Sequence, residues 1–86
     1  MAEYRVQVTR AAFKELESLP PDQGRRVLTA IESLIFDPRP KQSRKLAGSR
    51  VSYRVRVGDY RILYQVNERA KLVKVFAVGH RREVYR

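Results

Sequence analysis

The sequence has 86 residues, no cysteine and a formal charge of +10, with 19 lysines and arginines against nine aspartates and glutamates. This length predicts one domain over residues 1–86 with a modest core, and the lack of cysteine excludes disulfides and thiolate metal sites. The opening MAEYRVQVTR lacks the apolar stretch of a secretory signal, and no segment is long enough to span a bilayer. We therefore expect a soluble, cytoplasmic protein with no membrane partner.

The first elements are predicted to be a strand followed by a helix. Apolar and polar residues alternate over residues 3–8, which is typical of a strand with one buried face. Thr9 is a good N-cap for a helix that extends to about Ser18. The apolar face of this helix is formed by Phe13, Leu16 and Leu19.

A second helix and a basic loop are predicted next. Pro20 and Pro21 end the first helix, and the second begins at these prolines or at Asp22. Its apolar stripe contains Val27, Leu28, Ile31, Leu34 and Ile35. The prolines of residues 37–40 then end the helix and open the basic loop KQSRKLAGSR over residues 41–50.

The second half of the chain predicts three strands joined by short turns. Alternating segments cover residues 51–57 and 60–66, and Gly58-Asp59 between them is typical of a two-residue hairpin turn. Residues 67–70 form a second turn, and residues 72–78 form the last strand. The predicted fold is α+β, in the order β-α-α-β-β-β. Two N-terminal helices pack on one face of a mainly antiparallel, four-stranded sheet.

The hairpin is expected to bring three arginines together. A two-residue turn pairs Val57 with Tyr60 and therefore Arg56 with Arg61. Because side chains alternate with period two, Arg54 lies on the same face as this pair, away from the helices. Like charges placed directly opposite destabilise a sheet, and a bound phosphate would neutralise them. The alternative is that the arginines only cover the solvated face of the sheet.

The wider charge pattern favours a polyanionic partner but does not identify it. Asp59 is the single acid between Arg39 and Arg61, a segment that carries eight basic residues. Arginine outnumbers lysine, which suits forked contacts to phosphate. The charge alone does not separate RNA from DNA, anionic lipid or an acidic protein. The acids are scattered without metal-ligand spacing, so no metal site is predicted.

The C-terminal residues add chemistry where the last strand ends. The segment GHRREVYR contains His80, Arg81, Arg82 and Tyr85. Histidine ordinarily exchanges a proton near neutral pH. On their own features, His80 is more consistent with an exposed loop residue, and Tyr85 fits a terminal packing residue as well as a catalytic one.

The pattern KLAG, YRVRVGDYRILYQV and KVFAVGHRREVYR, preceded by a strand and two helices, resembles the RelE-type toxins of toxin–antitoxin modules over essentially the whole chain. The resemblance implies a microbial-ribonuclease-like fold with no cofactor and no metal. It implies a ribosome-dependent endoribonuclease that cleaves messenger RNA in the A site by attack of the RNA 2′-hydroxyl. Translation would be inhibited as a result.

The resemblance also implies roles for individual residues. The candidate catalytic residues are Arg54, Arg56, Arg61, His80, Arg81 and Tyr85. The candidate RNA-binding residues are Lys41, Arg44, Lys45, Arg50 and Arg82. Well-studied relatives have lysines where this chain has Arg54 and Arg56, and one of those lysines can act as the base. Arginine stays protonated and is a poor base, so either His80 or Tyr85 is expected to move protons.

Two other functions stay open at this point, and the resemblance implies a set of partners. ParE-type relatives share the fold but poison DNA gyrase, and a third alternative is a non-catalytic RNA-binding protein. The expected partners are the ribosome, messenger RNA and a cognate antitoxin protein, with promoter DNA reached only through the antitoxin. Codon preference and oligomeric state do not follow from the sequence.

Overall fold

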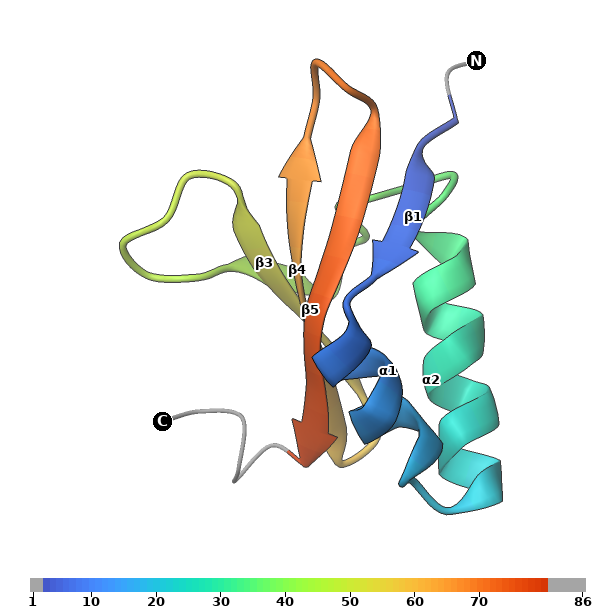
Figure 1. The fold of residues 1–86 in the computed structure, drawn as a ribbon. Helices are drawn as coiled ribbons and strands as arrows, with labels where there is room; N and C mark the ends of the chain where they lie inside the picture. The colour runs from blue at the N-terminus through green and yellow to red at the C-terminus, as the bar shows by residue number, and fades with distance from the viewer. Residues whose placement is uncertain (1–2, 81–86) are drawn as a thin grey trace.

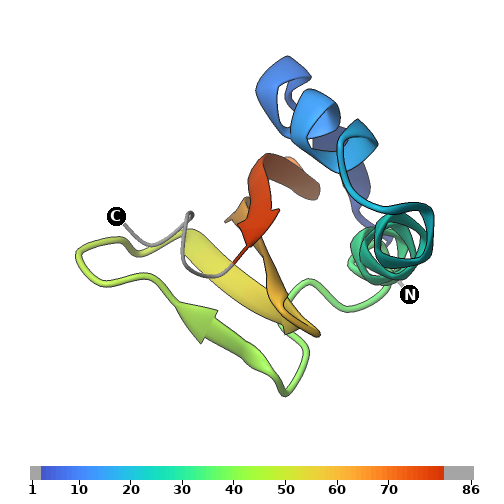
Figure 2. The ribbon, with the colours of Figure 1, turned by 90° about the horizontal axis from the view of Figure 1, so that it is seen from below.

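The computed structural model describes residues 3–80 and shows a five-stranded sheet with two helices on one of its faces (Figure 1). The elements in chain order are β1 Arg5–Val8, α1 Arg10–Glu17, α2 Pro21–Ser33, β2 Ser43–Lys45, β3 Ser52–Val57, β4 Tyr60–Asn67 and β5 Leu72–His80. The strands lie in the order β1-β5-β4-β3-β2. Seen from below (Figure 2), both helices lie on the same side of the sheet, which confirms the predicted α+β class.

The two helices begin and end close to where the sequence predicts. The Thr9 hydroxyl oxygen accepts a hydrogen bond from the Ala12 amide at 3.1 Å and so caps α1, while Pro21 occupies the first position of α2. Neither helix is long and apolar enough to cross a membrane.

The buried faces of the helices differ in part from the prediction. Ala12 and Val27 are fully buried, whereas Phe13 and Leu28, which follow them directly, are 50% and 44% exposed. Successive residues lie about 100° apart around a helix, so a residue next to the buried line points to the side. The small Ala12 allows α1 to approach β5 closely, and this leaves the bulkier Phe13 outside the contact.

The hairpin between β3 and β4 has the predicted register. Val57 pairs with Tyr60, Arg56 with Arg61, and Arg54 with Leu63. Gly58 has a φ of 60°, a left-handed conformation that favours glycine at the first central position of a tight hairpin turn. The turn chemistry therefore sets which side chains are opposed across the two strands.

The sheet has one strand more than predicted, because part of the basic loop pairs with β3. The three residues of β2 run antiparallel to β3, and Arg44 lies opposite Arg54. The four-stranded sheet of the prediction is therefore wrong by one edge strand. The sequence of β2 is SRK, which has neither the length nor the apolar alternation by which a strand is recognised. Short, charged strands are typical of sheet edges.

A bulge in β5 interrupts its pairing with β4. Leu63 lies opposite Ala77, but the next residue, Tyr64, lies opposite Val75, so that β5 has one extra residue at Phe76. Both Val75 and Val78 are consequently buried beneath the helices, although they are three positions apart. The bulge reverses which face of the sheet each later residue of β5 occupies.

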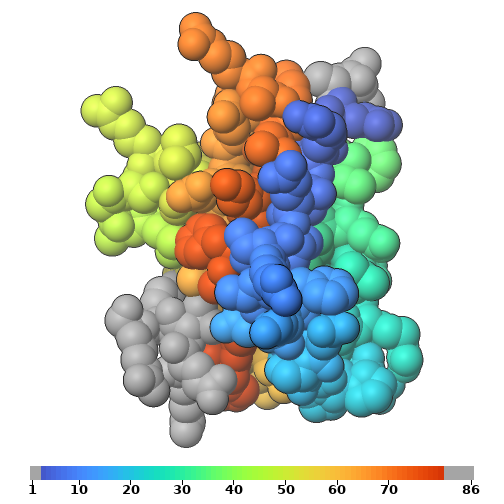
Figure 3. Space-filling model, viewed as in Figure 1, coloured from blue at the N-terminus to red at the C-terminus, as the bar shows by residue number. Residues whose placement is uncertain are grey.

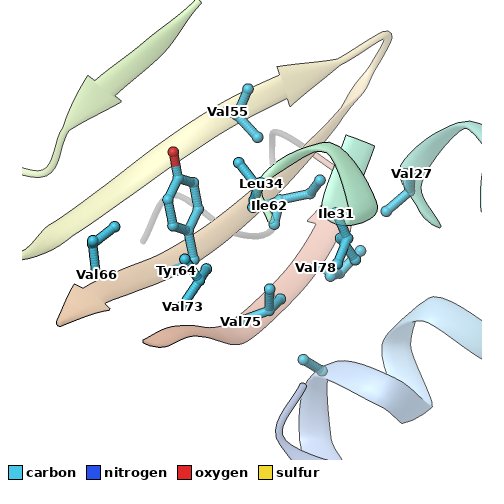
Figure 4. Close-up of a cluster of buried hydrophobic side chains, with 11 residues drawn as sticks. Val27, Ile31, Leu34, Val55, Ile62, Tyr64, Val66, Val73, Val75 and Val78 are labelled. Atoms are coloured by element: carbon cyan, nitrogen blue, oxygen red, sulfur yellow. The ribbon is translucent and has the colours of Figure 1, made fainter. Parts of the chain in front are cut away.

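The core lies between the helices and the sheet and is made mainly of valines and isoleucines around one tyrosine (Figure 4). Tyr64 is fully buried, and its ring stacks on that of Tyr53 with centroids 5.9 Å apart. Its hydroxyl donates a hydrogen bond of 2.7 Å to the Pro38 carbonyl, so the one polar atom of this side chain is satisfied. This bond ties the loop after α2 to the centre of the sheet.

Candidate anion-binding site

A cationic pocket lies on the face of the sheet that the helices leave open. It has a volume of about 320 Å³, in the range of about 300–1,000 Å³ that is usual for small-ligand pockets. The residues that line it come from three neighbouring strands and the turn before them, and they are Gln42, Arg44, Arg54, Arg56 and Arg61. Val55 and Ile62 are buried in the core between these positions, so alternation directs the arginines to the opposite face. The sequence therefore predicted correctly that Arg54, Arg56 and Arg61 converge.

The pocket concentrates positive charge in two cross-strand pairs. Arg44 lies opposite Arg54, and Arg56 lies opposite Arg61. None of the described residues that line the pocket is acidic. Opposed like charges destabilise a sheet by roughly 0.2–1 kcal/mol per pair, so an anion bound here is favoured by both its own contacts and the relief of this repulsion.

The arginines differ in how far they are held in place. Arg54 and Arg61 are half-buried, and the Nε and Nη1 atoms of Arg61 lie out of contact with solvent. Arg44 is exposed, but its Nη1 donates to the carbonyl oxygens of Lys41 at 3.1 Å and Ser43 at 2.9 Å. A guanidinium that is oriented before the ligand arrives loses less entropy when the ligand binds. Arg56 is exposed at the rim.

His80, one of the two candidates for proton transfer, is not among the residues that line this pocket. It pairs with Tyr60 on the helix-covered side of the sheet, and the two rings meet edge to face with centroids 5.7 Å apart. Its neighbour Gly79 is the residue that lies opposite Arg61. The bulge at Phe76 causes this arrangement, because strict alternation along β5 would have given His80 the opposite face.

The residues proposed to bind RNA are spread over different surfaces. Lys41 is exposed beside the pocket, and Arg44 lines it. Lys45 pairs with Tyr53, whose ring stacks on the core residue Tyr64, so alternation directs Lys45 away from the arginines. Arg50 is exposed in the loop between β2 and β3, which projects from one side of the molecule in Figure 3. The other candidates, which lie outside the described residues, are Arg81, Arg82 and Tyr85.

A second group of contacts, which the sequence did not predict, holds the loop that leads into the pocket. Arg39 forms an ion pair with Glu68 and lies over the Tyr53 ring, with its guanidinium carbon 5.6 Å from the ring centroid. Glu68 also accepts a hydrogen bond from the Tyr4 hydroxyl. These residues are distant in sequence, and no local pattern signals their contact. Together with the Tyr64 bond to Pro38, they fix the start of the segment that supplies Gln42 and Arg44.

The described residues form a cationic pocket and show no cluster that would bind a metal ion. Within residues 3–80, no three histidine or carboxylate side chains gather closely enough to hold one. Four arginines line one pocket that is large enough for a phosphate group. The fold and the pocket thus define a small α+β protein with a cationic pocket on the open face of its sheet.

Comparison with known proteins assigns this chain to a family. A family model described as "ParE toxin of type II toxin-antitoxin system, parDE" matches residues 6–85. The chain therefore belongs to the RelE/ParE superfamily of toxins from type II toxin–antitoxin modules.

Individual relatives agree with this assignment. The putative toxin RelE1 of Methanocaldococcus jannaschii is 29% identical, with 96% of each chain covered. Toxin RelG of Mycobacterium tuberculosis is 31% identical, with 96% of this chain and 97% of that protein covered. The toxin in the archaeal RelE–RelB complex from Pyrococcus horikoshii superimposes with a TM-score of 0.83 at 35% identity, covering 98% of this chain and 100% of that chain. A chain of the intact Escherichia coli RelBE complex gives a TM-score of 0.78 at 25% identity, covering 90% and 95%.

Proposed function

We propose that this chain is an endoribonuclease that cleaves messenger RNA in the A site of the ribosome, without a metal ion, and so inhibits translation. The observation that carries the proposal is the convergence of four arginines on one pocket of about 320 Å³. Transfer at phosphorus spreads negative charge over the equatorial oxygens, and fixed guanidiniums stabilise that charge where they lie. The relatives named RelE support the role of a toxin, and the resemblance of the sequence to RelE-type toxins implies this activity.

The reaction is an internal transfer within the RNA. The 2′-oxygen forms a bond to the adjacent phosphorus while the bond from phosphorus to the 5′-oxygen breaks. The products are a 2′,3′-cyclic phosphate and a 5′-hydroxyl end. The arginines from β3 and β4 bind the non-bridging oxygens, and their charge lowers the energy of the transition state most, because there the phosphoryl group is most negative.

A separate group must take the 2′-hydroxyl proton, because arginine does not release its own. His80 packs on Tyr60 across the sheet from the arginines, so we assign this role to Tyr85, which lies outside the described residues. As a phenolate stabilised by the positive charge of the arginines, Tyr85 takes the proton from the 2′-hydroxyl. Water donates a proton to the departing 5′-oxygen, and the hydroxide that is left takes the phenol proton of Tyr85. Arg81 is assigned to the phosphate together with the pocket arginines.

The partners follow from the same proposal. The relatives in the solved complexes are bound to RelB antitoxins, and we propose that a cognate antitoxin binds this chain and masks its arginine pocket. Promoter DNA would be reached only through that antitoxin. Action on ribosomes implies a cytoplasmic location.

The test is cleavage of a short messenger RNA on purified ribosomes, with excess toxin and mapping of the new 5′ ends. Arg61→Ala should slow cleavage by about 10²–10³-fold, which is the usual effect of removing one transition-state donor. Arg10→Ala is the matched control, because Arg10 is an exposed arginine at the start of α1 on the helix side. The proposal is wrong if wild-type protein cuts no translated RNA, or if Arg61→Ala cuts as fast as Arg10→Ala.

A second function is favoured by one observation, the ParE description of the matching family model. Under this alternative the chain poisons DNA gyrase through protein contact. Purified gyrase and supercoiled DNA separate the two functions: gyrase-dependent DNA breaks without RNA cleavage would support the alternative. In that case neither wild type nor the arginine variants would cleave RNA.

A further inference from the structure

Among the described residues, the side chains that line the arginine pocket offer hydrogen-bond donors, with one exception that can also accept. Arginine has five N–H donors and no acceptor. Of the residues that line the pocket, only Gln42 has a side chain that can accept a hydrogen bond, through its amide oxygen. The phosphate group of an RNA linkage offers only acceptors, which the arginines satisfy. The ribose 2′-hydroxyl beside it is the group that offers a donor.

Gln42 is held in place by the turn in which it lies. The Ser43 amide donates to the Pro40 carbonyl oxygen at 2.9 Å, and the Ser43 hydroxyl donates to the same oxygen at 2.7 Å. These bonds close the segment from Pro40 to Ser43, with Gln42 inside it. The turn continues directly into β2, so the backbone of Gln42 keeps a defined position two residues before Arg44, which lines the same pocket.

We propose that the Gln42 amide oxygen accepts a hydrogen bond from the 2′-hydroxyl next to the bound phosphate, and that this contact selects RNA over DNA. The proposal rests on the proposed ribonuclease function and adds a specificity-determining residue to it. Gln42 does not take the proton, since a neutral amide is far too weak a base. It orients the 2′-oxygen toward phosphorus, so that one contact both distinguishes the sugar and aligns the nucleophile.

The first experiment measures single-turnover cleavage on programmed ribosomes with saturating toxin. Gln42→Leu removes the acceptor at nearly constant volume and should slow cleavage about 3- to 10-fold, the usual effect of one lost neutral hydrogen bond. Gln42→Glu keeps an acceptor oxygen at the same position and should cleave faster than Gln42→Leu when the toxin is saturating. Because Gln42 is exposed, both variants should have the thermal midpoint of wild type.

The second experiment measures binding, which a general loosening of the turn would not change selectively. In an Arg61→Ala background, where cleavage is slow, affinity is compared for ribosomes programmed with all-ribose RNA and with RNA that carries one 2′-deoxy nucleotide at the cleaved linkage. The unsubstituted Gln42 should prefer the ribose form about 3- to 10-fold. Gln42→Leu should abolish this preference, and Gln42→Glu should retain it even if its added negative charge weakens binding to both RNAs.

The outcomes separate this inference from the proposed function. If wild-type protein cleaves RNA and Gln42→Leu cleaves equally fast, or keeps the ribose preference, the role of Gln42 is overturned and the ribonuclease proposal stands. If wild-type protein cleaves no RNA on ribosomes, both are overturned together.

Discussion

Arg56 and Arg61 pair across the hairpin because the turn between them has two residues. Gly58 accommodates a φ of 60°, the turn has two residues, and the pairing of the two arginines follows by counting outward. Opposing them destabilises the hairpin, and it places both guanidiniums at the cationic pocket. His80 illustrates the opposite case, since its face of the sheet depends on a bulge that its own sequence does not signal.

Tyr64 supports the pocket indirectly, because its hydroxyl binds the Pro38 carbonyl in the loop that leads to the pocket. It is fully buried, and burial raises the pKa of its phenol from 10.0 to about 12, because the charged phenolate would lose its hydration. A raised pKa in the folded state means that the neutral form stabilises the fold. This contribution is complete below pH 10 and is lost as the pH rises through about 12.

We therefore expect alkaline pH to destabilise wild type more than a Tyr64→Phe variant. The free energy of unfolding of wild type should fall by about 2 kcal/mol more than that of the variant by pH 12, because only wild type has this phenol to ionise. Below about pH 9, where the phenol is neutral, Tyr64→Phe should have the lower free energy of unfolding, by roughly 1 kcal/mol, because it lacks the bond to Pro38. Urea unfolding at several pH values measures both differences. Parallel losses for the two proteins would show that Tyr64 does not titrate with a raised pKa.

At the scale of elements, β5 is the strand that decides which residues reach the open face. Its bulge allows Val75 and Val78 to be buried together and sets the small residues Ala77 and Gly79 on the side of the arginines. The pairing of β5 with β1 ends at Val75, so the amide of Val78 bonds to a different element. The Val78 amide donates to the Glu15 carboxylate of α1 at 2.8 Å. This contact connects a helix to the end of the strand.

Glu15→Ala should destabilise the protein by about 1–2 kcal/mol, because the Val78 amide loses a charged acceptor in a partly buried place. Glu17→Ala is the matched control, since it removes the same group from an exposed position of α1. Chemical unfolding of both variants gives the comparison. A cost no larger for Glu15→Ala than for Glu17→Ala would mean that this bond does not stabilise β5.

At the scale of the whole molecule, the two faces of the sheet have different charge. Arginines line the open face, whereas the hollow around His80 on the other side includes Asp22 and Asp59. Helices cover one face, none of the described residues forms a helix over the other (Figure 2), and the arginine pocket is therefore left open to solvent. Such a distribution orients a polyanion toward the arginine pocket before contact.

The same distribution predicts that anions stabilise the fold specifically. Millimolar sulfate should raise the thermal midpoint of wild type more than chloride at equal ionic strength, because a divalent anion bridges the arginine pairs. Arg56→Ala should reduce this difference and, at low salt, should itself be stabilising by about 0.2–1 kcal/mol. Arg10→Ala should respond as wild type does. Equal effects of sulfate and chloride would show only general screening.

The sequence by itself determined the helices, the hairpin register and the shared face of Arg54, Arg56 and Arg61, because capping, turn geometry and period-two alternation are local. Only the tertiary structure decided the rest. The pairing of β2, the bulge that turns His80 away, and the bond from Tyr64 to Pro38 all depend on how separate elements pack together. Such contacts depend on how the layers pack, and packing leaves no periodic trace in the chain.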